Sequence, residues 1–179
     1  FYEGGLASFV TWLNTNRKPL HPKPIIIETL KDDVDVQIAL QYDAGYQENT
    51  LTFVNNINTH EGGTHLSGFR AALTRTLNAY ARNKGLLKEK DDNLAGEDIR
   101  EGITAIISVR LRDPQFEGQT KAKLGNTAMK TLVQKATNEK LGDWLEENPT
   151  EANKIVRKGI AASQARAAAK KARDVVRNK

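Results

Sequence analysis

The chain has 179 residues, enough for one domain with a short extension, and 39% of them are hydrophobic, enough to build a buried core. It contains no cysteine, which excludes disulfides and thiolate chemistry, and no apolar run of membrane-spanning length. The net charge of +5 is uneven: residues 154–179 hold nine Lys or Arg and one Asp, whereas the rest holds 18 basic and 21 acidic residues. This asymmetry indicates either a polyanion near the C-terminal segment or a solvated helix face.

The first third of the chain predicts a helix followed by paired strands. The chain begins at Phe1 without a methionine, so we expect a piece of a longer protein. Residues 6–14 have helical apolar spacing, and the prolines that follow end the helix. A short β-rich run comes next, and residues 34–42 then alternate apolar and polar side chains, which predicts a half-buried strand. We expect residues 46–57 to form its antiparallel partner.

The rest of the chain predicts helices around one more strand. Apolar steps of three and four predict a helix over residues 66–83, and alternation predicts a strand over 103–111. A loop over residues 113–126 leads to a helix over 127–147, and the last helix starts at about Pro149 and spans about 45 Å. Strands and helices alternate but include a hairpin, so the sequence predicts an α+β fold with a mixed sheet.

Three segments in fixed order carry a family resemblance: EGGTHLSGFRAALTRTLN from residue 61, GEDIREG from residue 96, and EGQTKAKLGN from residue 117. Together they resemble the second, transducer domain of the DNA gyrase B subunits, which are type IIA DNA topoisomerases. The resemblance implies a four-stranded sheet covered by helices on one face, like a ribosomal-protein domain. It also implies a left-handed crossover, although sequence alone favours a right-handed one. The implied division is a transducer domain at residues 1–150 and a long basic C-terminal helix at 151–179, leading toward the next domain.

Lys121 is the strongest candidate for a functional residue. It lies in a loop between a strand and a helix, flanked by Gly118 and Gly125, and its ammonium group is a compact point charge suited to a terminal phosphate. By itself this pattern also fits a surface lysine in a polar loop. The resemblance implies that Gln119 and Lys121 reach the γ-phosphate of ATP, with Lys121 in the catalytic role.

The resemblance also implies cofactors and partners. We expect ATP and Mg²⁺ in the parent enzyme, an ATP-hydrolysing DNA topoisomerase, to be bound mainly by a domain absent from this chain. We expect the chain alone to bind neither and to be inactive, since it has no Walker-type loop and no GxGxxG motif. The implied partners are the N-terminal ATPase domain and the metal-binding cleavage domain of the same subunit, the gyrase A subunit and double-stranded DNA. The implied location is the bacterial cytoplasm, at the nucleoid and with no membrane contact.

The HEGGTH segment at residues 60–65 superficially matches a zinc protease motif. That motif needs two histidines four residues apart on a helix, whereas His60 and His65 are five apart and two glycines lie between them. With three histidines and no cysteine in the chain, we expect no metal site.

Two groups of basic residues are candidates for DNA contact. Arg70 falls at the border of the apolar face of its helix, and the resemblance implies that this position lines the opening through which a DNA segment passes. On the last helix, four basic residues recur at steps of four, three and four: Arg166, Lys170, Arg173 and Arg177. Such a stripe gives salt-sensitive, non-specific attraction to phosphates, and the alternative is a solvated face.

The favoured function is the gyrase B transducer, which couples ATP binding and hydrolysis in the adjacent domain to DNA strand passage and supercoiling. Two alternatives stay open: the same domain of topoisomerase IV, and a stand-alone nucleic-acid-binding module of ribosomal-protein type. The loop with Gln119 and Lys121 separates them, because a pure nucleic-acid module has no use for a loop that contacts a nucleotide phosphate.

Overall fold

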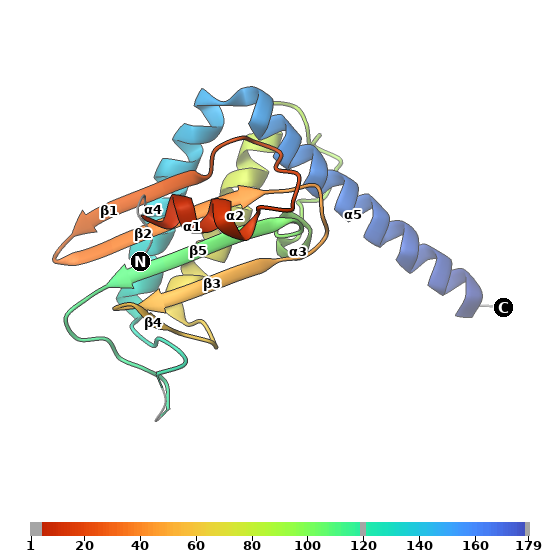
Figure 1. Ribbon diagram of the computed structural model, residues 1–179. Helices are drawn as coiled ribbons and strands as arrows, with labels where there is room; N and C mark the ends of the chain where they lie inside the picture. The colour runs from red at the N-terminus through yellow and green to blue at the C-terminus, as the bar shows by residue number, and fades with distance from the viewer. Residues whose placement is uncertain (1–4, 119–120, 178–179) are drawn as a thin grey trace.

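The computed structural model describes residues 5–118 and 121–177. Figure 1 shows a twisted sheet with helices on both sides and the end of one helix extending away from the fold. In chain order the elements are α1 (Gly5–Leu13), β1 (Ile25–Lys31), β2 (Val34–Tyr42), β3 (Asn49–Val54), β4 (Ile57–Asn58), α2 (Thr64–Asn83), α3 (Gly96–Ile99), β5 (Ile103–Arg110), α4 (Thr127–Glu147) and α5 (Pro149–Arg177).

The sheet is mixed and has five strands in the order β1-β2-β5-β3-β4. Strands β3 and β5 are parallel, and the other three neighbouring pairs are antiparallel. The predicted α+β class is therefore confirmed. The predicted count of four strands is wrong, because the chain turns back at Asn55 and Asn56, both with positive φ, and adds the two-residue strand β4.

The hairpin lies one strand earlier than the sequence predicts. Strands β1 and β2 are joined by Asp32 and Asp33, whose φ values of 53° and 62° suit a two-residue hairpin turn. The predicted pairing of residues 46–57 with β2 is wrong, because β1 and β5 already occupy both edges of β2. Strand β3 pairs in parallel with β5 instead, and α2 and α3 lie in the connection between them.

Helices cover both faces of the sheet. In Figure 1, α2 and α4 lie behind the sheet and α1 lies in front of it. The buried side chains follow this division, since Ile38 joins Phe69 of α2 and Val133 of α4 in the main core. Its neighbour Ala39 points the other way and joins Val10 of α1 in a second, smaller core. The prediction of helices on one face therefore misses α1.

Helix α5 begins at Pro149, as predicted, and its buried residues all lie in its first half. The buried residues of this half are Ala152, Ile155, Val156, Gly159 and Ala162. From residue 164 to residue 177 every side chain is exposed, and Figure 1 shows this half projecting alone. Neither α5 nor any other helix in the described residues is long and apolar enough to cross a membrane.

Candidate functional site

The loop between β5 and α4 is folded into a small hairpin. Its two sides are joined by backbone hydrogen bonds from Glu117 N to Lys123 O (2.8 Å) and from Gly125 N to Gln115 O (2.6 Å). The side chains of Lys123 and Glu117 add a salt bridge of 3.1 Å. These contacts join residues 115–117 to residues 123–125 across the loop.

Lys121 lies at the tip of this hairpin, and its side chain is exposed. It makes no ion pair or hydrogen bond with any other residue that the structure describes. Its ammonium group is therefore available to an anion from outside the chain. Gln119, the second residue predicted at the phosphate, lies outside the described residues.

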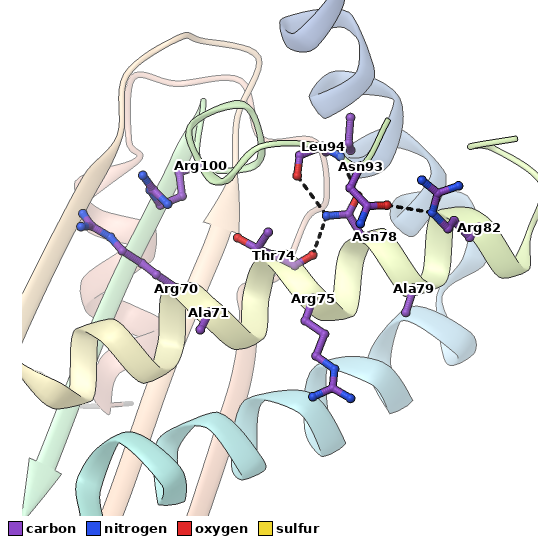
Figure 2. A pocket seen from close by; sticks show the side chains of 10 residues that line it. All are labelled: Arg70, Ala71, Thr74, Arg75, Asn78, Ala79, Arg82, Asn93, Leu94 and Arg100. Carbon is purple, nitrogen blue, oxygen red and sulfur yellow. Dashed lines mark hydrogen bonds between the residues drawn. The ribbon is translucent and has the colours of Figure 1, made fainter. Parts of the chain in front are cut away.

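The outer side of α2 carries an open hollow of about 660 Å³ that is rich in arginine (Figure 2). Three of the arginines come from α2 and one follows α3. We call these four residues the arginine surface: Arg70, Arg75, Arg82 and Arg100. A concentration of guanidinium groups around one hollow is suited to phosphate, because each group presents several fixed donors.

Two arginines of the arginine surface donate hydrogen bonds to the same carboxylate. Glu48 accepts a hydrogen bond from Arg70 Nη2 at 2.9 Å and another from Arg100 Nε at 3.1 Å. Burial alone would raise the pKa of Glu48, but the hydrogen bonds and charges of Arg70 and Arg100 outweigh it and lower the pKa. Glu48 therefore stays ionised and holds both arginines in place, while the surface keeps an excess of positive charge.

The remaining two arginines differ in how they are held. Arg82 donates to Asn93 Oδ1 at 2.8 Å and to the backbone oxygens of Lys88 and Asp91 at 3.0 and 2.8 Å, so its charge is not neutralised. Arg75 is exposed, has no ion pair within the described chain and points toward the α4 side in Figure 2.

Sequence reasoning identified part of this surface. Arg70 lies at the edge of the α2 core face, as its helical position predicts, and its side chain is 39% exposed. Arg100 and Glu48 were not predicted, since they come from segments far from α2 in the sequence. The local signal for Arg100 was weak, because a single arginine after a short acidic turn is a common feature of protein surfaces.

The fold divides the basic stripe of α5. Arg166 donates from Nε to Asp98 Oδ1 at 3.1 Å and from Nη2 to Asp98 Oδ2 at 2.7 Å, and it lies 3.2 Å from Glu97. The other members are exposed and form no ion pair within the described residues: Lys170, Arg173 and Arg177. Three of the four stripe residues therefore present uncompensated charge.

The histidines of residues 60–65 are not arranged as metal ligands. His65 is fully buried, its Nε2 lies 3.2 Å from Thr59 Oγ1, and burial lowers its pKa to about 4. His60 is exposed. Within residues 5–118 and 121–177 there is no group of three or more His, Cys, Asp or Glu side chains that could hold a metal ion.

The family model described as DNA gyrase B matches residues 5–175. The chain belongs to the DNA gyrase B family. The gyrase B protein of Streptomyces coelicolor is 59% identical over 181 residues, which cover 99% of this chain and 26% of that protein. The gyrase B protein of Staphylococcus aureus is 54% identical over 178 residues, which cover 99% of this chain and 28% of that protein. The chain thus spans about a quarter of the length of these gyrase B relatives.

Solved structures agree with the family. The 43K ATPase domain of Thermus thermophilus gyrase B is 42% identical with a TM-score of 0.89, over 96% of this chain and 46% of that one. The ATP-binding domain of Francisella tularensis topoisomerase IV is 29% identical with a TM-score of 0.79, over 92% of this chain and 44% of that one.

These matches correct the prediction about cofactors. The prediction that ATP and Mg²⁺ are bound mainly by a domain absent from this chain, and not by the chain alone, is wrong. The chain superposes on nearly half of a structure that is itself the gyrase B ATPase domain. It therefore corresponds to part of that ATPase domain. The sequence misled here because the chain has no recognisable nucleotide motif, although a site can be assembled from residues of several segments.

Proposed function

We propose that this chain is the transducer part of a gyrase B ATPase region: it contacts the terminal phosphate of ATP through Lys121 and transmits that state to the parts that handle DNA. The observation that carries the proposal is Lys121, which is exposed and forms no ion pair within the described residues, beside a pair of backbone hydrogen bonds that join the two sides of its loop, on a domain that also bears the arginine surface. A contact that exists with ATP and disappears after phosphate release favours one conformation over another, which is what a switch requires.

Lys121 stabilises charge rather than moving a proton. In phosphoryl transfer to water, negative charge builds up around the transferred group, and a fixed ammonium group there lowers the barrier. Backbone hydrogen bonds on both sides of the loop hold the chain close to Lys121, as from Glu117 N to Lys123 O. Gln119 adds an amide donor in this proposal, as the QTK segment of the family resemblance implies.

The proposal gives residues 1–150 the transducer role, with the left-handed crossover in the connection from β3 to β5, and residues 151–179 the role of a basic helix that leads to the next domain. The partners are the rest of the same subunit, the gyrase A subunit and double-stranded DNA, and the activity served is ATP-driven supercoiling in the bacterial cytoplasm. Gyrase is favoured over topoisomerase IV, because the gyrase B proteins of Streptomyces coelicolor and Staphylococcus aureus are 59% and 54% identical over 99% of this chain.

Two surfaces are proposed to contact DNA. The arginine surface, which includes the predicted Arg70, has four guanidinium groups, and only two of them share the Glu48 carboxylate. The exposed half of α5 adds three residues of the basic stripe that form no ion pair within the described residues: Lys170, Arg173 and Arg177. Arg166 contributes less to DNA contact in this proposal than the sequence predicts, because its guanidinium is already bound to Asp98.

The test is Lys121→Ala in the full-length gyrase B protein assembled with gyrase A. We expect ATP turnover to fall by about 10²–10³-fold, while the nucleotide dissociation constant changes far less, since the contact matters most as charge develops. Lys123→Ala is the matched control, because it removes a cation from the same hairpin that is already paired with Glu117. Wild-type turnover in Lys121→Ala would remove this lysine from the mechanism.

A further inference from the structure

The Lys121 hairpin is joined by its backbone to the segment that enters α2. Glu61 N–H donates to Ala122 O at 2.8 Å, Leu124 N–H donates to Gly62 O at 3.0 Å, and Thr64 N–H donates to Leu124 O at 3.0 Å. We call these three hydrogen bonds the junction ladder. The first of them involves Ala122, the residue directly after Lys121, so the chain next to Lys121 is bonded to the segment that enters α2.

Gly63 makes this close approach possible. Its φ of 130° and ψ of −159° are a conformation that residues with a side chain rarely adopt. A Cβ atom at Gly63 would overlap the backbone N and O of Leu124 and come within 2.8 Å of its Cα. Because the obstructing atoms are backbone, they cannot rotate aside, and any side chain at position 63 has to push the hairpin away from α2.

The surroundings of the junction ladder are equally constrained. A Cβ atom at Gly68, one turn into α2, would overlap Lys130 O and lie 3.1 Å from Lys130 Cα, so α2 and the start of α4 are also in backbone contact. Leu124 is fully buried in the main core. The end of the hairpin therefore contacts the start of α2 at Gly63, and the helix that follows the hairpin contacts α2 at Gly68.

We propose that Gly63 is a positioning residue, and that the junction ladder makes the Lys121 hairpin and α2 a single rigid body. The inference rests on the proposed contact between Lys121 and the terminal phosphate. When Lys121 binds that phosphate, α2 is fixed in the same step, and the arginines on its outer side are fixed with it. The junction ladder is the physical link between the nucleotide state and the arginine surface.

Two substitutions weaken this link in different ways. Gly63→Ala inserts a methyl group into the backbone contact. Thr64→Pro removes one rung, the Thr64 N–H, at the first position of α2, where proline is well tolerated and where the Thr64 hydroxyl has no hydrogen bond to lose within the described chain. Gly85→Ala is the control, since Gly85 also has positive φ, 73°, but a Cβ there meets nothing within 4 Å.

In the full-length protein with gyrase A, we expect Gly63→Ala and Thr64→Pro to lower kcat for ATP by about tenfold or more and to abolish its stimulation by DNA, with KM changed less than about threefold. Gly85→Ala should keep both properties. In a Lys121→Ala background, Gly63→Ala should cause no further loss, because it acts through that lysine. An additional loss of the same size would show a merely structural role and overturn the proposal.

Hydrogen exchange in the wild-type protein tests the proposal without any substitution. A non-hydrolysable ATP analogue should slow amide exchange in residues 58–66 and 121–126 together. Slower exchange in residues 121–126 alone would overturn the rigid link. If Lys121→Ala retains full turnover, the proposed function fails; if Lys121→Ala is inactive but folded Gly63→Ala and Thr64→Pro behave like wild type, only the positioning role fails.

Discussion

The Arg166 guanidinium of α5 binds the buried Asp98 carboxylate of α3 through two hydrogen bonds, of 3.1 and 2.7 Å. Asp98 has a side-chain exposure of 4%, so its carboxylate is almost removed from water and has Arg166 as its hydrogen-bonded cation. The pair ties α5 to α3 just beyond Ala162, the last buried residue of the helix.

Arg166→Gln should destabilise the fold, because it leaves a buried carboxylate without its cation. We expect the melting temperature of the chain to fall by about 2–4 °C, as measured by circular dichroism. Arg173→Gln, one of the exposed residues on the same helix, should leave the melting temperature unchanged. Equal stability of the two variants would contradict the tethering role of Arg166.

The remaining stripe residues should govern salt-dependent binding of duplex DNA. Replacing Lys170, Arg173 and Arg177 with Gln keeps helix propensity but removes three positive charges. We expect the slope of log K against log salt, measured by fluorescence anisotropy, to become shallower by about 2 to 3. Arg166→Gln should change this slope much less, since its charge is already paired. An unchanged slope in the triple variant would show that the stripe is only a solvated helix face.

Glu48 should oppose DNA binding while it orders the arginine surface. Glu48→Gln removes the carboxylate shared by Arg70 and Arg100 and makes this surface more positive by one charge. We expect duplex DNA to bind a few-fold more tightly at low salt and Arg75→Gln to shift affinity in the opposite direction. Weaker binding by Glu48→Gln would show that order at Arg70 and Arg100 matters more than net charge.

The stability of the fold should decline as the pH falls from 6.5 to 4. Burial lowers the pKa of His65 from 6.5 to about 4, so in this window the unfolded chain binds a proton that the folded chain does not. The full stability is present above pH 6.5, and up to about 3 kcal/mol is lost on reaching pH 4. Burial also lowers the pKa of His21, which adds a loss of the same sign.

Urea unfolding of the chain at several pH values measures this loss. His65→Gln keeps a polar group beside Thr59 and removes the titration of His65, so it should flatten the pH dependence and leave the smaller contributions of His21 and, toward pH 4, of Glu48. If the stability of His65→Gln depends on pH as strongly as that of the unsubstituted chain, His65 is not the main source of the stability lost at low pH.

Local pattern in the sequence determined the main elements and the family. Alternation marked the strands at residues 34–42 and 103–111, and apolar steps of three and four marked α2, because these periods reflect the geometry of single elements. The ordered segments around Gly63, Gly96 and Lys121 sufficed for the resemblance to gyrase B, which the match over residues 5–175 confirms.

Only the tertiary structure decided which segments meet. The parallel pairing of β3 with β5, the sharing of Glu48 by Arg70 and Arg100, and the junction ladder at Gly63 each join residues that are tens of positions apart. No local period encodes such contacts, since a strand has two edges and a charged side chain has many possible partners. The packing of α2 and α4 on the sheet selects among them, because it brings Leu124 against Gly63 and leaves Lys121 exposed at the tip of its hairpin.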